Sequence, residues 1–401
     1  MSRNRGRRRP RPEDGPDRLG LRAELQTLDE RALRRQLIEL ETPQGVRVRV
    51  GDRELINLSS NDYLGLAAHP LVRDAAAHGA RTWGGGAGAS RLVTGNLALH
   101  SSAEAELAGL VGLPAARLFG SGYLANVGLL TAVAGAGDAI FSDARNHASI
   151  IDGCRLSRAE VRVFAHNDAA DLDRWLAASE ARRKIVVVEG LFSMDGDLAD
   201  LPAILERVRA HGAFLVIDEA HAVGVLGPRG GGALEHFGLD ASSGDVAVVG
   251  TLGKALGSYG AFIAGPSVLC EYLVSAGRTL MFSTAPPPAA VAAARAALVL
   301  AEREPWRRER ALAVAASLRD TLRELGLDVP EAEGPVVPAI VGPAAEAVAL
   351  SDRLLREGLL VRVFRPPTVP ERASRLRLAA SAAMDGPLLE EALDRLRRGF
   401  D

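Results

Sequence analysis

Short apolar, β-branched stretches alternate with longer helix-like stretches through the middle of the chain, from about Asn61 to Thr284. The clearest strands are predicted at residues 139–142, 161–164, 185–189, 214–218, 246–250 and 260–264. Helix-like stretches such as 171–178 and 202–211 separate several of them. Because strands joined through helices run parallel, the alternation predicts an α/β fold with a mainly parallel sheet and helices on both faces.

The segments on either side of this region have patterns of their own. Residues 21–40 show helical apolar spacing, and residues 45–58 alternate as in a β-hairpin. After three prolines at 286–288, a long helix and then the order strand, helix, strand, strand, helix predict a small α+β domain. We therefore expect a basic tail over 1–20, a helix and hairpin over 21–60, a large domain over 61–285 and a small C-terminal domain over 286–401.

Composition excludes several classes of protein. The net charge of -2 over 401 residues gives the folded body no general attraction to nucleic acid or anionic lipid. Arginines crowd the first twelve residues, where a solvated tail is the favoured interpretation over a nucleic-acid contact. Two separated cysteines argue against disulfides and a zinc site, and we expect no metal. Neither a secretory signal nor a membrane-spanning stretch is evident, so the sequence predicts a cytoplasmic protein.

Lysine is almost absent from the chain. Of 48 basic residues only Lys184 and Lys254 are lysines, and the rest are arginine. Arginine serves wherever a positive charge alone is needed, whereas a lysine amine can lose its proton and attack a carbonyl carbon. A surviving lysine is therefore a candidate for covalent chemistry.

Lys254 lies in a glycine-rich turn, Thr251 to Gly257, directly after the predicted strand 246–250. Ligands of open α/β sheets bind at the carboxyl ends of strands, and glycines allow the backbone to approach a bulky ring. An ordinary surface lysine in a turn is an equally good interpretation of this motif alone, and the scarcity of lysine favours function.

Asp218 ends the preceding apolar strand, and His221 follows three residues later. Taken singly, such an aspartate is more often a helix cap and such a histidine a structural residue. Pyridoxal 5'-phosphate (PLP), however, needs a lysine for its imine and a carboxylate facing its pyridine nitrogen. With Lys254 one strand later, the three residues together favour a PLP site.

Three further loops after predicted strands could complete such a site. Gly122 and Tyr123 precede an apolar helix whose first amides suit a phosphate, His147 offers a flat ring for stacking, and Ser193 offers a hydroxyl. Each signal is weak alone, because such residues are ordinary in turns. The glycines of 84–91 lack the spacing and the preceding strand of a dinucleotide loop, so backbone flexibility near a substrate channel is the expected role.

From about Leu33 to Leu396 the chain resembles the α-oxoamine synthases, a PLP fold-type-I family. Its members join an amino acid to an acyl thioester with loss of carbon dioxide. The likeness rests on residues 59–66, 192–197, 364–370 and 375–378, of which 364–370 points most specifically to the biotin-pathway branch. The resemblance implies a PLP-dependent transferase fold with a large seven-stranded sheet domain and a small C-terminal domain.

The resemblance also implies residue roles. Lys254 is similar to the Schiff-base lysine, Asp218 to the partner of the pyridine nitrogen and His147 to the stacking histidine. Further cofactor contacts are implied at Gly122, Tyr123, Ser193, His221 and Thr251. Substrate contacts are implied at His147, Thr368 and Arg377, with Arg377 holding the amino-acid carboxylate. An N-terminal substrate arginine is either Arg34 or Arg35, and Arg35 is preferred.

The activity implied is an acyltransferase reaction of biotin biosynthesis, between L-alanine and a pimeloyl thioester carried by coenzyme A or by an acyl carrier protein. A homodimer is expected, with Ser283 and Thr284 reaching the partner's cofactor phosphate. Two alternatives remain open at this point. One is a sister enzyme that uses glycine and a short acyl-CoA, and the other is a non-catalytic partner subunit, which would be expected to lack Lys254.

Overall fold

The computed structural model describes residues 17–400, so the basic segment 1–16 lies outside the described residues. A seven-stranded sheet forms the centre of the large domain, in the spatial order β3-β9-β8-β7-β6-β4-β5. Six of its strands run in the same direction, and only β9 runs opposite to them, pairing antiparallel with both of its neighbours. The sheet consists of β3 (Ala115–Phe119), β4 (Ala139–Asp143), β5 (Glu160–Phe164), β6 (Lys184–Glu189), β7 (Phe214–Asp218), β8 (Val246–Thr251) and β9 (Ala261–Gly265). The prediction of a mainly parallel sheet is confirmed, although sequence reasoning missed β3.

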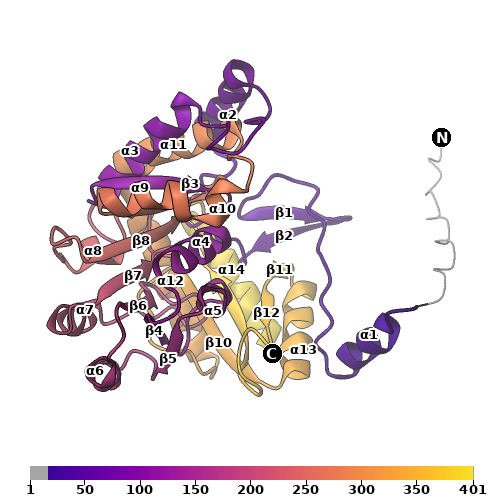
Figure 1. The fold of residues 1–401 in the computed structure, drawn as a ribbon. Helices are drawn as coiled ribbons and strands as arrows, with labels where there is room; N and C mark the ends of the chain where they lie inside the picture. Colours follow the sequence, from indigo (N-terminus) through magenta and orange to yellow (C-terminus); the bar gives the residue numbers. More distant parts are fainter. Residues whose placement is uncertain (1–16, 401) are drawn as a thin grey trace.

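Side chains alternate between the two faces of this sheet. On β7, Leu215 and Ile217 belong to one buried apolar cluster, whereas Val216 belongs to the cluster on the opposite face. Helices therefore cover both sides, as predicted (Figure 1). The first face is covered by α3 (Ala98–Leu110), α6 (Ala169–Ala178), α7 (Leu201–Ala210), α8 (Ala233–His236) and α11 (Pro288–Arg303). The second face is covered by α4 (Gly122–Val133), α5 (Ala148–Ser157), α9 (Ser267–Ala276) and α10 (Arg278–Met281).

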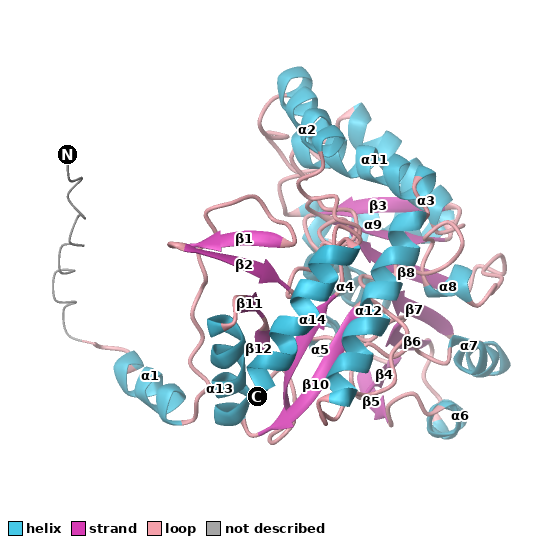
Figure 2. Cartoon of the chain, turned by 180° about the vertical axis from the view of Figure 1, so that it is seen from behind, coloured by secondary structure: helices cyan, strands magenta, loops and turns pink. Residues whose placement is uncertain are grey.

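A second apolar core holds the small domain together, beside the large sheet (Figure 2). Its three-stranded sheet has the order β10-β13-β12, with all pairings antiparallel. The elements are α12 (Trp306–Glu324), β10 (Val336–Gly342), α13 (Ala344–Arg356), β11 (Leu359–Leu360), β12 (Arg362–Phe364), β13 (Ser374–Ala379) and α14 (Gly386–Phe400). The predicted order of strand, helix, strand, strand, helix differs by one strand, because three strands, β11, β12 and β13, lie between α13 and α14.

The N-terminal hairpin is β1 (Arg47–Val50) with β2 (Arg53–Asn57), as predicted. β2 also pairs in parallel with β11, so the hairpin belongs to the same side of the molecule as the small domain. α11 packs against α2 (Pro70–Trp83), and its buried residues join the large-domain core. We propose that the two domains divide between α11 and α12, which refines the expected boundary at 286.

Two predicted helices differ from those observed. The helix expected over 21–40 is only α1 (Leu21–Glu30), because the chain turns at Ala32, whose φ is 53°. The following residues, through Leu40, contain no helix, and the carbonyls of Arg34 and Gln36 accept from Arg365 and Arg362 of the small domain. The long helix expected after Pro288 is two helices, α11 and α12, which are separated at Glu304 and Pro305. Among residues 17–400 no helix is both long and apolar enough to cross a membrane.

Candidate active site

Acidic and basic groups meet at the carboxyl ends of three adjacent strands, β6, β7 and β8. In this register Glu189 lies beside Asp218, and the turn that follows β8 carries Lys254. Burial lowers the pKa of Lys254 to about 8, and the Arg377 charge adds to the decrease while Asp218 opposes it. A lysine with that pKa keeps about a tenth of its amine neutral at pH 7.

His221 connects Lys254 to the loop before α2. Its Nε2 lies 2.6 Å from Nζ of Lys254, and its Nδ1 lies 2.7 Å from the hydroxyl of Tyr63. The Tyr63 hydroxyl donates to Oδ1 of Asn61 at 3.1 Å, so this network assigns His221 as donor at Nδ1 and acceptor at Nε2. Burial, followed by the charges of Lys254 and Arg377, lowers the pKa of His221 well below its ordinary value. The imidazole is therefore neutral when it accepts from the lysine.

Asp218 is held by two donors at the end of β7. Its Oδ2 accepts from Nδ2 of Asn126 at 2.6 Å, and its Oδ1 accepts from the amide of Ala220 at 2.9 Å. Asn126 also donates to Ser149, whose hydroxyl lies 2.8 Å from Nδ1 of His147. A continuous chain of hydrogen bonds thus joins the predicted pyridine partner to the predicted stacking histidine, which is itself exposed.

Glu189 adds a second buried acid to the site. Burial, and after it the neighbouring Asp218 carboxylate, raises its pKa to about 8. Its Oε2 accepts from the amide of Ser193 at 3.1 Å, while its Oε1 is buried without a partner in the described chain. Two adjacent carboxylates are least costly with one of them protonated, and Glu189 is that one.

Arg377 approaches from the small domain. It is only 5% exposed, lies on β13, and donates weakly to Asn61 at 3.3 Å and Tyr63 at 3.5 Å. Its guanidinium lies 5.2 Å from the Phe364 ring, and its Nε is buried without a hydrogen-bond partner among residues 17–400. No carboxylate within those residues forms an ion pair with it. The adjacent Arg375, by contrast, is paired with Asp195.

The remaining predicted residues have more varied surroundings. Gly122 and Tyr123 open α4, where the first amides of a helix lack intrahelical acceptors, and the Tyr123 hydroxyl donates to Asp152 at 2.6 Å. The Thr251 hydroxyl donates to the carbonyl of Gly260 at 3.1 Å and so shapes the turn before Lys254. Thr368 is exposed in the loop after β12.

Arg34 and Arg35 point to different partners. Arg34 forms an ion pair with Asp29 at 2.6 Å. Arg35 donates to the carbonyls of Arg365 and Pro366 at 3.3 and 3.2 Å, and so contacts the loop that carries Thr368. We therefore propose Arg35, the arginine preferred from the sequence, as the one that contacts substrate.

Sequence reasoning missed several members of the site. Asn61 and Tyr63 lie within a motif that carried the resemblance, but neither had an assigned role. Asn126 lies one helical turn after Gly122, a spacing that places both on one face of α4. Glu189 ends its strand as Asp218 does, which is a signal that the sequence offered.

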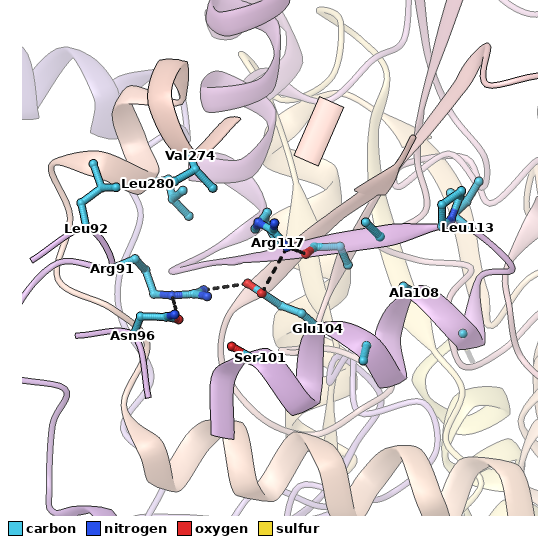
Figure 3. A pocket seen from close by; sticks show the side chains of 15 residues that line it. Arg91, Leu92, Asn96, Ser101, Glu104, Ala108, Leu113, Arg117, Val274 and Leu280 are labelled. Carbon is cyan, nitrogen blue, oxygen red and sulfur yellow. Dashed lines mark hydrogen bonds and ion pairs between the residues drawn. The ribbon is translucent and has the colours of Figure 1, made fainter. Parts of the chain in front are cut away.

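A pocket of about 610 Å³ lies elsewhere, between α3 and the edge strand β3 (Figure 3). Its polar groups pair with one another, since Glu104 binds Arg91 at 2.7 Å and Arg117 at 3.5 Å. Lys254, Asp218 and Arg377 do not line it. The chemistry of the site therefore lies at the strand ends and not in this pocket.

The donor set at the strand ends fits PLP. It offers an amine of lowered pKa, a buried carboxylate fixed by two donors and a guanidinium with an unpartnered buried nitrogen. Fold and site together define a PLP-dependent transferase. The chain matches the class I and II aminotransferases over residues 53–396.

Individual relatives indicate which PLP-dependent transferases the chain is similar to in sequence and in structure. The chain is 52% identical over 363 residues to the 8-amino-7-oxononanoate synthase of Anaeromyxobacter dehalogenans strain 2CP-1, a match covering 90% of this chain and 91% of that one. A solved variant of serine palmitoyltransferase from S. paucimobilis with a bound PLP–myriocin aldimine has a TM-score of 0.89 at 30% identity, covering 95% of this chain and 96% of that one. The 8-amino-7-oxononanoate synthase of Francisella tularensis has a TM-score of 0.73 at 27% identity, covering 86% and 97%.

The chain therefore belongs to the class I and II aminotransferase family, on the branch of the 8-amino-7-oxononanoate synthases, and is a PLP-dependent acyltransferase. This confirms the predicted fold, cofactor and enzyme class. It also removes the alternative of a non-catalytic subunit.

Proposed function

We propose that the chain condenses L-alanine with a pimeloyl thioester, releasing carbon dioxide and the thiol carrier, to form 8-amino-7-oxononanoate in biotin biosynthesis. The observation that carries the proposal is the buried Arg377 guanidinium, unpaired with any carboxylate of the described chain, beside a lysine of lowered pKa. The family match supports the same reaction.

The chain's own residues divide the work of holding PLP. When bound, PLP supplies an electron sink that stabilises negative charge at the amino-acid Cα. Lys254 provides the amine for its attachment, and the charge of Asp218 favours a protonated pyridine nitrogen. We propose that the other holding residues are Gly122, Tyr123, His147, Ser193, His221 and Thr251.

Arg377 binds the alanine carboxylate through two parallel N–H donors, a geometry that only a guanidinium offers. Lys254, once its amine is free, takes the Cα proton at Nζ and later returns it. A pKa near 8 suits an amine that must both accept and release a proton near neutral pH. His221 accepts from Nζ of Lys254 and thereby orients the lysine's lone pair toward the substrate.

We further propose that the enzyme acts as a cytoplasmic homodimer. Val93 and Phe282 are 73% and 69% exposed, and Phe282 directly precedes Ser283 and Thr284. Thr284 forms a bridge with Ser90 of the glycine-rich segment, which brings both segments together at the surface. Exposed apolar side chains of this size favour burial against a second copy. Light scattering on the purified protein tests the dimer.

Product analysis tests the reaction. The holoenzyme is offered alanine, glycine or serine together with pimeloyl-CoA, a pimeloyl carrier protein or succinyl-CoA, and the products are identified by mass spectrometry. We expect 8-amino-7-oxononanoate from alanine and a pimeloyl donor as the main product. A product formed only from glycine or serine, or only from the short acyl donor, would contradict the proposal.

A further inference from the structure

The loop between β6 and α7, residues 190–200, touches both domains; we call it the interdomain loop. Its Gly196 has φ of 73°, and a Cβ there would lie 2.7 Å from the carbonyl oxygen of Val336 on β10. The amide of Glu333 also donates to the carbonyl of Gly196 at 3.3 Å. The loop thus lies so close to the small domain that only glycine fits at position 196.

Asp195 forms a charged contact across this boundary. One carboxylate oxygen lies 3.0 Å from Nη1 of Arg145 in the large domain, and the other pairs with Nη1 of Arg375 in the small domain. Asp195 and Arg375 are 7% and 5% exposed, whereas the Arg145 side chain is 52% exposed. Removing one partner of a buried pair leaves an uncompensated charge. Loss of the Asp195–Arg375 contact should therefore cost more stability than loss of the exposed contact between Asp195 and Arg145.

Arg375 is structurally coupled to Arg377 by the geometry of β13. Side chains two residues apart on a strand lie on the same face, so both guanidinium groups project to the same side of the small sheet. β13 is also the central strand, with Arg377 opposite Pro338 and Arg362, and Arg375 opposite Ile340 and Phe364. Fixing Arg375 against Asp195 therefore fixes the face of β13 that carries Arg377.

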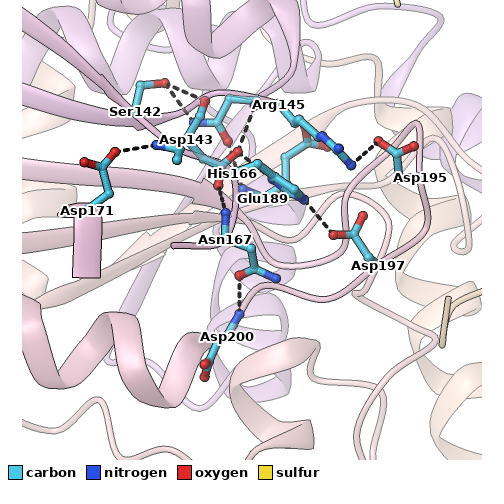
Figure 4. A network of polar contacts seen from close by, with 12 residues as sticks. Ser142, Asp143, Arg145, His166, Asn167, Asp171, Glu189, Asp195, Asp197 and Asp200 are labelled. Atoms are coloured by element: carbon cyan, nitrogen blue, oxygen red, sulfur yellow. Dashed lines mark hydrogen bonds and ion pairs between the residues drawn. The ribbon is translucent and has the colours of Figure 1, made fainter. Parts of the chain in front are cut away.

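The other end of the loop is fixed to the large domain (Figure 4). His166 lies between Asp143 and Asp197, 2.9 and 2.8 Å from their carboxylates, and its ring meets the Phe192 ring edge-on at 4.5 Å. Asn167 donates to the carbonyl of Leu198 at 2.8 Å. These contacts give the loop a rigid base from which Asp195 reaches the small domain.

We propose that Asp195 is a positioning residue, which sets the placement of Arg377 for the amino-acid carboxylate by holding Arg375. The inference rests on the proposed function, because it assumes that Arg377 binds that carboxylate. It assigns to the interdomain loop a role in amino-acid recognition, in addition to the cofactor contact proposed for Ser193.

Steady-state kinetics of the holoenzyme test the role. We compare Asp195→Asn, Arg375→Met and their double variant with Asp171→Asn, whose carboxylate also pairs with an arginine but lies wholly in the large domain. We expect each single variant at the contact to raise KM for alanine about tenfold and to leave KM for the thioester within about twofold. The double variant should be no worse than the poorer single, and Asp195→Glu should recover part of the loss because it keeps the charge.

An unchanged KM for alanine in Asp195→Asn, or additive losses in the double variant, would overturn the proposal. Hydrogen exchange gives an answer that does not depend on the substrate. Residues 190–200 and 374–379 should exchange faster in Asp195→Asn than in Asp171→Asn, and equal exchange would overturn the coupling. If the wild type does not use alanine, the proposed function fails while this exchange comparison still decides the contact.

Discussion

The imidazole of His221 accepts from Nζ of Lys254 at 2.6 Å while its other nitrogen lies 2.7 Å from the Tyr63 hydroxyl. Both ring nitrogens are thus in use, and the tautomer follows from the tyrosine's own bond to Asn61. A protonated His221 would place two positive charges in contact with each other in a buried site. Burial, and after it the Lys254 charge, lowers the pKa of His221, so the ring that contacts the lysine is neutral.

Lys254→Ala should abolish turnover, with a loss on the order of a thousandfold or more. The methyl side chain at position 254 offers neither an attachment for PLP nor a base for the Cα proton of the substrate. Lys184→Arg is the matched control. Lys184 only donates to the carbonyl of Leu176 at 2.9 Å, which arginine can also do, so activity should be nearly unchanged. Borohydride trapping with peptide mapping checks the attachment; a labelled peptide other than the one containing Lys254 would refute the assignment.

Asp218→Asn should retain PLP but lose several powers of ten in kcat. The amide keeps the shape of the carboxylate and removes the charge that favours a protonated pyridine nitrogen. Asp200→Asn is a suitable control, since Asp200 caps α7 through its bond to the amide of Ala203 at 3.2 Å. Cofactor content is measured by absorbance and turnover by product formation. Near-normal turnover in Asp218→Asn would remove its electronic role.

Arg377→Lys should weaken alanine binding and slow exchange of the alanine Cα proton, with cofactor content unchanged, because lysine loses the planar pair of donors. Thr368→Val should leave that exchange intact and impair condensation, since Thr368 lies in the exposed loop contacted by Arg35. Proton exchange in deuterated water without any thioester separates the two effects. Normal exchange in Arg377→Lys would place the carboxylate site elsewhere.

Arg35→Ala should raise KM for the acyl thioester several-fold, whereas Arg34→Ala should have little effect. Arg35 contacts the carbonyls of the 365–366 loop, while Arg34 forms a surface ion pair with Asp29, a kind of contact worth about 1 kcal/mol or less. Steady-state kinetics at saturating alanine measure both. The opposite ranking would reverse the choice between the two arginines.

His166 should make stability depend on pH. Burial lowers its pKa, but the hydrogen bonds to Asp143 and Asp197 outweigh burial and raise the pKa to about 9. Because the folded pKa exceeds the ordinary value of 6.5, the stabilisation is fully present below about pH 6.5 and is lost as pH rises through about 9. The contribution amounts to about 3 kcal/mol at most.

The groups that face His166 are the two carboxylates and the edge of the Phe192 ring. His166→Gln removes the titration while retaining a donor. Denaturant unfolding between pH 6 and 9.5 should therefore show wild type and variant converging as pH rises. A constant difference across that range would mean that His166 does not titrate in it.

Much of the fold and of the site's chemistry could be predicted from local patterns in the sequence. Short apolar, β-branched runs predicted six of the seven strands of the large sheet to within one residue at each end, because a strand that is buried on both faces is apolar almost throughout. Lys254 was marked by the rarity of lysine, and Asp218 by its place at the end of an apolar strand. The helix expected over 21–40 was wrong because its leucine spacing continues beyond the turn at Ala32, where the chain becomes extended.

What the sequence by itself determined was the identity and order of the strand-end residues, since these depend on neighbours only a few positions away. Only the tertiary structure decided that Lys254 meets His221, that the side chain of Arg35 and not that of Arg34 reaches the 365–366 loop, and that Asp195 pairs with Arg375 and leaves Arg377 without a carboxylate partner. Those contacts join residues up to 331 positions apart. Each choice of partner depends on how segments far apart in the chain pack against one another, which no local pattern of side chains encodes.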